Sequence, residues 1–202
     1  MHATFARFPT ETRQAEIVAA ALRLAQSCSP SSITTMDLAR AVGLTQGALF
    51  KHFPSKEAIW LAAMSWVAKH LLRTLNDAAQ QSPTPVEALH RVFNAHVAFV
   101  MAHPGVPRMI FHELQQPEDS QLKQQVRLLM QGYRQLLLGL LGSAAQRGDL
   151  VPELDAPAAA TLFLGIVQGL VMQSMMSGQI SSMQAEAPRV FHLYLRGICK
   201  TS

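Results

Sequence analysis

Cysteine is scarce in this sequence. Of its 202 residues only two, Cys28 and Cys199, are cysteine, and they lie far apart. Two such thiols supply neither a zinc cluster nor a disulfide framework, so the simplest expectation is a protein of a reducing compartment.

Long hydrophobic runs are missing as well. The N-terminus MHATFARFPTETRQ has no apolar run of signal-peptide length. The longest apolar stretch, LFLGIVQGLVM at 162–172, contains a Gln and two Gly and is too short to span a bilayer. We therefore expect a soluble protein of the cytoplasm.

The sequence also lacks the spacings of metal sites and catalytic sites. Four histidines, His90, His96, His103 and His112, fall in one region, but no pair has the i, i+4 spacing that places two imidazoles on one helical face. Composition does not exclude a Ser/His/Asp triad, but no strand–turn–helix nucleophile elbow is present. We expect no metal, no cofactor and no enzymatic activity.

Hydrophobic residues are abundant, and the few charges are unevenly placed. Hydrophobic residues make up 49% of the chain and the mean hydropathy is +0.14, which indicates a wide internal cavity or a subunit interface. Residues 1–56, which include Arg7, hold six Lys or Arg against three Asp or Glu, whereas the other 146 residues are nearly balanced. This excess favours a polyanionic partner near the N-terminus, although ordinary surface scatter is the alternative.

Helical periodicity runs through the sequence, and no segment shows sustained period-two alternation. The predicted fold class is therefore all-α. QQSPTP at 80–85 is the clearest local linker. We expect helices over residues 10 or 11 to 27, 34–43, 45–53 and 56–80, one that follows the linker and ends near 103, and then helices over 109–115, 118–147, 157–177 and 187–200.

Residues 35–53, TMDLARAVGLTQGALFKHF, fit a helix-turn-helix. Ala39 supplies the small residue where two helices touch, and Gly43 supplies the positive φ of the turn. Thr34 and Asp37 have the spacing of a capping box. The expected shared core consists of Leu38, Val42, Leu44, Leu49 and Phe53, with Met36 also buried.

The outward side of the second helix suits a DNA groove. Gly47, Ala48 and Lys51 point away from Leu49 and Phe53, so a small surface surrounds one cation. Around it lie residues that can reach base edges, sugars or phosphates, because they flank this face or stand at helix N-termini where the dipole favours anions. These further candidate contacts are Thr34, Thr35, Thr45, Gln46, Phe50, His52 and Lys56.

Several of these residues have alternative roles. Thr45 caps its helix in any case, His52 can be a polar residue packed on the next helix, and Lys51 and Lys56 can be ordinary solvated lysines.

The stretch ITTMDLARAVGLTQGALFKHFPSKEAIW, residues 33–60, resembles the signature of TetR/AcrR-family transcriptional regulators. The likeness is specific and covers roughly the first quarter of the chain, whereas the rest agrees only in length and helical pattern. The family usually has tyrosine where this chain has Phe50, so a hydroxyl often used on a phosphate is absent.

The resemblance implies a homodimer, usually a repressor, that binds a palindromic double-stranded operator and is released by a small molecule. It divides the chain into a three-helix DNA-binding domain at 1–55 and a C-terminal effector-binding and dimerisation domain at 56–202. The helix at 157–177 is apolar nearly all round and must be covered on more than one side. With the helix at 187–200 it would form the dimer interface.

Residues 99–176 are rich in Met and aromatic side chains. Methionine fills adaptable cavities and a few polar groups orient a guest, so, with the resemblance, a hydrophobic effector pocket is predicted. The alternative for each residue is plain core or dimer contact. The predicted lining is Phe99, Met109, Phe111, His112, Met130, Tyr133, Phe163, Gln168 and Met172.

Two other functions are compatible with the sequence. A ligand-independent architectural DNA binder would have no effector that changes DNA binding. A helical protein-interaction module with a vestigial DNA-binding end would not bind duplex DNA in a salt-sensitive manner.

Overall fold

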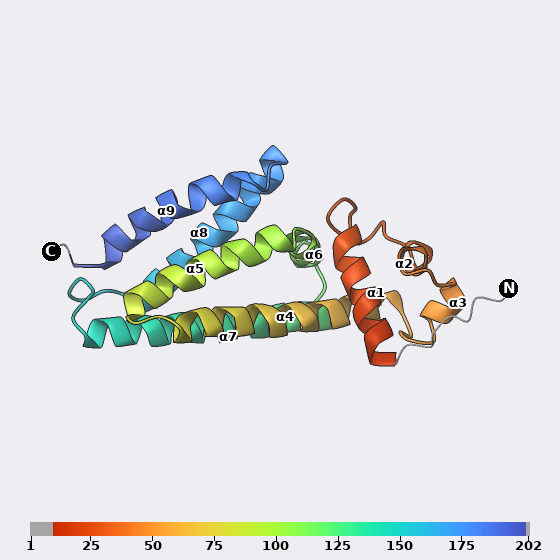
Figure 1. Ribbon diagram of the computed structural model, residues 1–202, viewed down its shortest axis with the longest axis horizontal. Coiled ribbons are helices and arrows are strands. Elements are labelled where there is room, and N and C mark those ends of the chain that lie inside the picture. Colours follow the sequence, from red (N-terminus) through yellow and green to blue (C-terminus); the bar gives the residue numbers. More distant parts are fainter. Residues whose placement is uncertain (1–9, 201–202) are drawn as a thin grey trace. The chain divides into compact units, whose positions relative to one another are not determined.

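The computed structural model describes residues 10–200, whose regular structure is helical (Figure 1). Within this range the only β geometry is an isolated bridge between Leu150 and Cys199. The predicted all-α fold is confirmed. The nine helices of the described range are α1 (Thr10–Leu24), α2 (Thr35–Ala41), α3 (Gln46–Leu49), α4 (Lys56–Gln80), α5 (Pro85–Ala102), α6 (Gly105–Leu114), α7 (Gln121–Gln146), α8 (Ala156–Ser177) and α9 (Ser182–Ile198).

Two helices begin four or five residues earlier than the sequence pattern predicts. α6 starts at Gly105 rather than 109, and α9 starts at Ser182 rather than 187. Pro188 therefore lies inside α9, where it costs one helical hydrogen bond. Met183 and Ala187 are both buried, so tertiary packing holds the turn before the proline in helical form.

The helices form two compact units. Unit 1 comprises residues up to 67 together with 105–125, and unit 2 comprises residues 68–104 together with those from 126 onward. Residues 1–9 lie outside the described range. They include Arg7, one of the six basic residues counted in residues 1–56.

In unit 1, α6 packs against α1 through Gly105. A Cβ built on this glycine would lie 2.0 Å from the carbonyl oxygen of Leu22 and 3.2 Å from the Cβ of Ala25. Only glycine permits such a close approach of two backbones. This contact fixes the start of α6, which carries Met109, His112 and Glu113.

In unit 2, aromatic side chains from α5, α8 and α9 form the centre of the core. Phe93 stacks on Phe191 with ring centroids 4.3 Å apart, and Phe163 meets Phe93 edge-on at 5.7 Å. Tyr194 is buried in the same cluster, and its hydroxyl donates to the carbonyl of Ala159 at 3.2 Å. Such offset and edge-to-face pairs add to the stability that comes from apolar burial.

The apolar helix α8 has one exposed side. By length and composition it is the one helix of the described residues that could cross a membrane, yet its most apolar window is 33% buried inside the protein. The full helix is longer than the apolar stretch visible in the sequence. A single helix of this kind is weak evidence for a membrane span, and α8 packs against both α5 and α9 (Figure 1).

Candidate nucleic-acid interface and ligand cavity

The turn between α2 and α3 has the geometry that its sequence predicts. Gly43 has φ of +67°, and the amide of Leu44 donates to the carbonyl of Ala39 at 2.8 Å. Leu38, Leu49 and Phe53 are buried, as expected, and so is Ala39 at the helix contact. Val42 and Leu44, also expected in this core, are only half-buried, because they flank the exposed turn at Gly43. A helix-turn-helix is therefore built by local hydrogen bonds and a small apolar core.

Met36 does not follow the prediction. Its side chain is 55% exposed, so it lies outside the core of this unit. Met36 is the second residue of a helix of only seven residues, whose buried side is supplied by Leu38 and Ala39.

Threonines begin both helices of the motif. The amide of Asp37 donates to Thr34 Oγ1 at 3.1 Å, and the Thr34 amide donates to Asp37 Oδ2 at 2.9 Å, which completes the predicted capping box. The hydrogen bonds from the Thr34 hydroxyl and amide lower the pKa of the Asp37 carboxyl. Thr45 caps α3 by accepting from the Ala48 amide at 3.2 Å. Capping thus occupies one acceptor site of each threonine.

A side-chain hydrogen bond joins the starts of α2 and α3. Gln46 Nε2 donates to Thr35 Oγ1 at 2.6 Å. Two of the predicted DNA contacts are therefore held next to each other, and each fixes the rotamer of the other. Such fixed side chains lose little entropy when they meet a partner.

The surface next to this pair is small and apolar. A Cβ built on Gly47 would meet nothing within 4 Å, so the fold itself leaves room for a larger residue. Ala48 is half-buried, and Phe50, which follows α3, is 43% exposed. An exposed phenylalanine and an unneeded glycine on one short segment indicate a surface shaped for a partner.

The second helix of the motif is shorter than predicted. It ends at Leu49, and the amides of Lys51 and His52 donate to carbonyls three residues back, at 3.2 Å and 2.9 Å. Lys51 and His52 therefore lie in the turn that follows α3. The residue before a proline disfavours helical geometry, which ends the segment before Pro54.

His52 is partly enclosed. Its backbone carbonyl accepts from Gln14 Nε2 at 2.9 Å, and its ring atom Nδ1 is buried without a hydrogen-bond partner. Of its two ring nitrogens, only Nε2 is available to meet a phosphate at the surface.

Lys56 contacts the chain segment between α1 and α2. Its Nζ donates to the carbonyl of Ser31 at 3.0 Å. An ammonium has three donors, so this bond leaves two for other acceptors.

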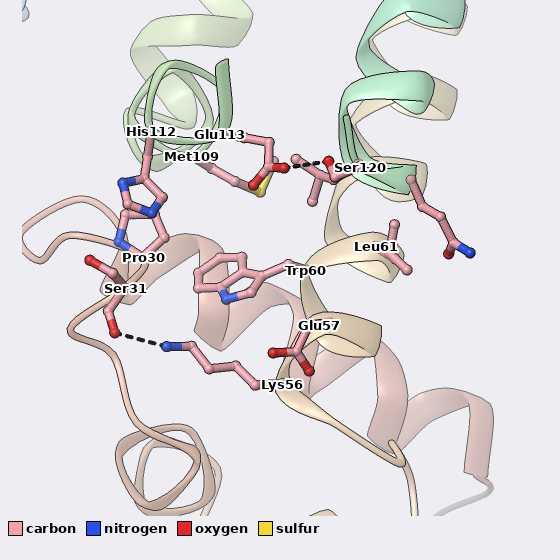
Figure 2. Close-up of a pocket in the computed structure, with 12 residues that line it drawn as sticks. Pro30, Ser31, Lys56, Glu57, Trp60, Leu61, Met109, His112, Glu113 and Ser120 are labelled. Atoms are coloured by element: carbon pink, nitrogen blue, oxygen red, sulfur yellow. Dashed lines mark hydrogen bonds between the residues drawn. The ribbon is translucent and has the colours of Figure 1, made fainter. Parts of the chain in front are cut away.

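A cavity of about 380 Å³ lies beside Lys56 in unit 1. Figure 2 shows the indole of Trp60 in the middle of the site, with Lys56 and Glu57 on one side and Met109 and Glu113 on the other. The full lining is Pro30, Ser31, Lys56, Glu57, Trp60, Leu61, Met109, His112, Glu113, Ser120, Gln121 and Leu122.

Only two of the predicted pocket residues, Met109 and His112, line this cavity. Phe111 is half-buried in α6 of the same unit, and the others belong to unit 2. Sequence reasoning missed Trp60, although its spacing of four residues from Lys56 places both on one face of α4.

The remaining predicted pocket residues have different environments within unit 2. Tyr133 and Phe163 are fully buried and meet edge-on at 6.2 Å, whereas Phe99 lies against His103 at 4.8 Å. Met130 is half-buried, and Gln168 and Met172 lie on the exposed side of α8.

A polar pair missed by sequence reasoning lies beside the aromatic core of unit 2. His96 Nδ1 and the Tyr133 hydroxyl are 3.2 Å apart, and burial lowers the pKa of His96 to about 4. Burial also raises the pKa of Tyr133. Both groups are therefore neutral at physiological pH.

Large apolar side chains are exposed on α8 and α9. Met176 is 75% exposed and Leu193 is 66% exposed, and Leu162 and Met172 are about half exposed. Isolated exposed apolar residues are common, but here they occur on two helices that pack against each other.

Two family models match the chain. The model for bacterial regulatory proteins of the tetR family matches residues 17–63, and the model for the C-terminal region of YsiA-like proteins matches residues 67–197.

A related protein is the nucleoid occlusion factor SlmA of Marinomonas sp. (strain MWYL1). It is 21% identical over 79% of this chain and 81% of its own length.

Solved structures have the same fold. The transcriptional regulator FadR from Bacillus subtilis, in complex with stearoyl-CoA, has a TM-score of 0.79 at 21% identity and covers 91% of this chain and 98% of its own. NalD, the secondary repressor of the MexAB-OprM multidrug efflux pump in Pseudomonas aeruginosa, has a TM-score of 0.68 at 18% identity, with coverages of 96% and 100%.

Proposed function

The chain belongs to the tetR family of bacterial regulatory proteins, and we propose that it represses transcription from a palindromic operator until a small hydrophobic or amphipathic effector releases it. Membership makes the chain a non-enzymatic, DNA-binding transcriptional regulator that dimerises. The operator symmetry, the sign of regulation and the release by an effector are the parts that we propose.

The observation that carries the proposal is the surface of α3 and the turn after it. Gly47 is exposed with open space around it, Phe50 is exposed, and Gln46 is held by Thr35. A small surface allows the backbone to approach the floor of a major groove, and Gln46 and Lys51 then reach base edges or phosphates. The other contacts that we propose are Thr34, Thr45, Ala48, His52 and Lys56.

The proposed dimer interface consists of α8 and α9. Their exposed residues Leu162, Met172, Met176 and Leu193 support it, because covering them in a second copy removes large apolar surfaces from water. Two copies then present two recognition elements to two half-sites of a palindrome. The interface accounts for α8 being apolar on its exposed side as well as on its buried side.

The two domains that we propose are those expected from the sequence. Residues 1–55 bind DNA, and residues 56–202 bind the effector and dimerise. The effector pocket includes apolar residues of the C-terminal part, with Met109 among them. Because the target of the protein is DNA, we place it in the cytoplasm. FadR in complex with stearoyl-CoA and the repressor NalD show that this fold occurs in proteins with such properties.

Operator binding and effector response can be tested on one duplex. A random-sequence library is selected with the wild-type protein, and the enriched duplex is titrated at several salt concentrations. We expect a two-fold symmetric site, binding that weakens steeply with salt, and an apolar compound from a broad panel that raises both the melting temperature and the Kd for DNA. A panel in which no compound changes either quantity would contradict release by an effector.

A second candidate is a DNA-binding protein that acts without an effector. The likeness to proteins named nucleoid occlusion factors supports it, because that name refers to the nucleoid and to no small molecule. The same compound panel separates the two candidates, since this one predicts salt-sensitive DNA binding that no compound alters.

A further inference from the structure

The cavity of unit 1 has the size and the walls of a small-molecule site. Its volume of about 380 Å³ lies within the usual range of roughly 300–1,000 Å³. Trp60, Met109 and Leu122 are almost fully buried and supply apolar walls. The indole of Trp60 lies in the middle of the site (Figure 2).

The charges around the cavity favour a cation. The cavity lining includes two carboxylates, Glu57 and Glu113, against one lysine, Lys56, and one histidine, His112. Hydrogen bonds from its own backbone and from Ser55, together with the charge of Lys56, lower the pKa of the Glu57 carboxyl, so it is ionised at neutral pH.

Glu113 has no opposite charge of its own. It accepts a hydrogen bond from the Ser120 hydroxyl, and the ion pairs described within residues 10–200 do not include it. A cavity lined by both a tryptophan and a carboxylate suits an organic cation, because the aromatic quadrupole and the negative charge both attract positive charge.

Lys56 connects the cavity to the DNA-binding surface. Its ammonium lines the cavity and is bonded to the carbonyl of Ser31, which lies three residues before Thr34, the cap of α2. A second cation in the cavity repels this ammonium and crowds Pro30 and Ser31. Loss of the bond between Lys56 and Ser31 would release the segment that leads into α2.

We propose that the cavity binds a small organic cation with an apolar body, and that its occupant lowers DNA affinity by displacing Lys56 from Ser31. This inference rests on the function proposed above and names the site and the chemical class of the effector. The apolar body lies on Trp60, and the cationic group lies near Glu113.

Binding is measured through Trp60 itself. Trp66 is the only other tryptophan, so the Trp66→Phe variant leaves Trp60 as the sole indole reporter. The probes are benzyltrimethylammonium, its uncharged carbon isostere neopentylbenzene, and phenylacetate. We expect saturable fluorescence changes with a Kd at least about fivefold lower for the cation than for the isostere, and the weakest binding for the anion. Calorimetry on the wild-type protein should give the same order; equal affinities or a preference for phenylacetate would overturn the proposal.

The charge contribution is tested by Glu113→Gln. The glutamine keeps an acceptor for Ser120, so the fold should be preserved. We expect the cation to bind about three- to fivefold more weakly, whereas the isostere is unaffected. Glu118→Gln is the matched control, because this substitution removes the same charge. Glu118 is exposed and lies outside the cavity lining. Equal losses in the two variants would overturn the assignment of the cation to this site.

Coupling to DNA is measured with the selected duplex. Benzyltrimethylammonium should raise the Kd for DNA. In Glu113→Gln, the concentration of the compound that gives half of this effect should be about three- to fivefold higher, whereas DNA binding without the compound should be unchanged. Binding at Trp60 with unchanged DNA affinity would overturn the displacement of Lys56. It would leave the proposed repressor function intact if another compound of the panel released DNA through a different site.

Discussion

Gly47 offers the sharpest test of the DNA-binding surface, because the fold does not require a glycine there. Its φ is not positive and a Cβ would meet nothing within 4 Å. In an exposed helical position, replacing glycine by alanine stabilises by about 0.5–1 kcal/mol. Since α3 is a single turn, we expect Gly47→Ala to raise the free energy of unfolding by about 0.5 kcal/mol and the Tm by roughly 1–2 °C.

Gly47→Leu tests the groove contact itself. The free protein has space for the larger side chain, but a groove floor that approaches the backbone does not. We expect DNA affinity to fall by about tenfold to a hundredfold, which corresponds to roughly 1–3 kcal/mol, the free energy of one lost base contact. Fluorescence anisotropy with the selected duplex measures the Kd, and thermal unfolding confirms that the fold is retained.

Gly139→Leu is the matched control. Gly139 is an exposed helical glycine of unit 2 with nothing within 4 Å of a built Cβ, so it shares the local environment of Gly47 but lies outside the proposed DNA contacts. Its substitution should leave the Kd for DNA unchanged. Wild-type DNA affinity in Gly47→Leu would refute the assignment of this face to the groove.

Three further outcomes are expected. If Lys51 contacts a guanine, Lys51→Ala should weaken DNA binding by about 1–3 kcal/mol. If it contacts a phosphate, the slope of log K against log salt concentration should become shallower by about one. The double change Leu162→Glu with Leu193→Glu should convert a dimer to a monomer in sedimentation and weaken binding to a two-fold site, because both exposed residues belong to the proposed interface. Acid should destabilise the protein through His96. Burial holds its pKa at about 4, so as the pH falls below about 6.5 the unfolded chain takes up the proton first, and stability drops by up to about 3 kcal/mol between pH 6.5 and 4. His96→Gln should flatten this part of the stability profile.

Each of these predictions has a matched control on an exposed residue. Lys69→Ala removes the same charge from unit 2, and Leu114→Glu introduces the same carboxylate outside the proposed interface. His192→Gln removes an exposed histidine from α9. An equal loss of DNA affinity in Lys69→Ala and Lys51→Ala would contradict the role of Lys51. A wild-type protein that sediments as a monomer at micromolar concentration would contradict the dimer, and an unchanged dependence of stability on pH in His96→Gln would contradict the role of His96.

The sequence by itself determined the features that depend on neighbours in the chain. The capping box of Thr34 and Asp37 and the turn at Gly43 involve hydrogen bonds across three to five residues, and their residue types allow few alternatives. The all-α class followed from periodicity for the same reason. The family resemblance also lay in this local pattern, and the match to the tetR family model covers it.

Only the tertiary structure decided which distant residues meet. The bond from Lys56 to Ser31 spans 25 positions and the contact of His96 with Tyr133 spans 37, and no local pattern specifies either. Periodicity identifies the apolar side of a helix but not the helix that covers it, which is why Met36 was wrongly expected in the core and why Trp60 was missed beside the cavity. Gly105 shows the physical reason most directly. Its sequence context reads as a break between helices, yet its lack of a side chain matters because the backbone of Leu22 lies against it, and that neighbour is supplied by the fold alone.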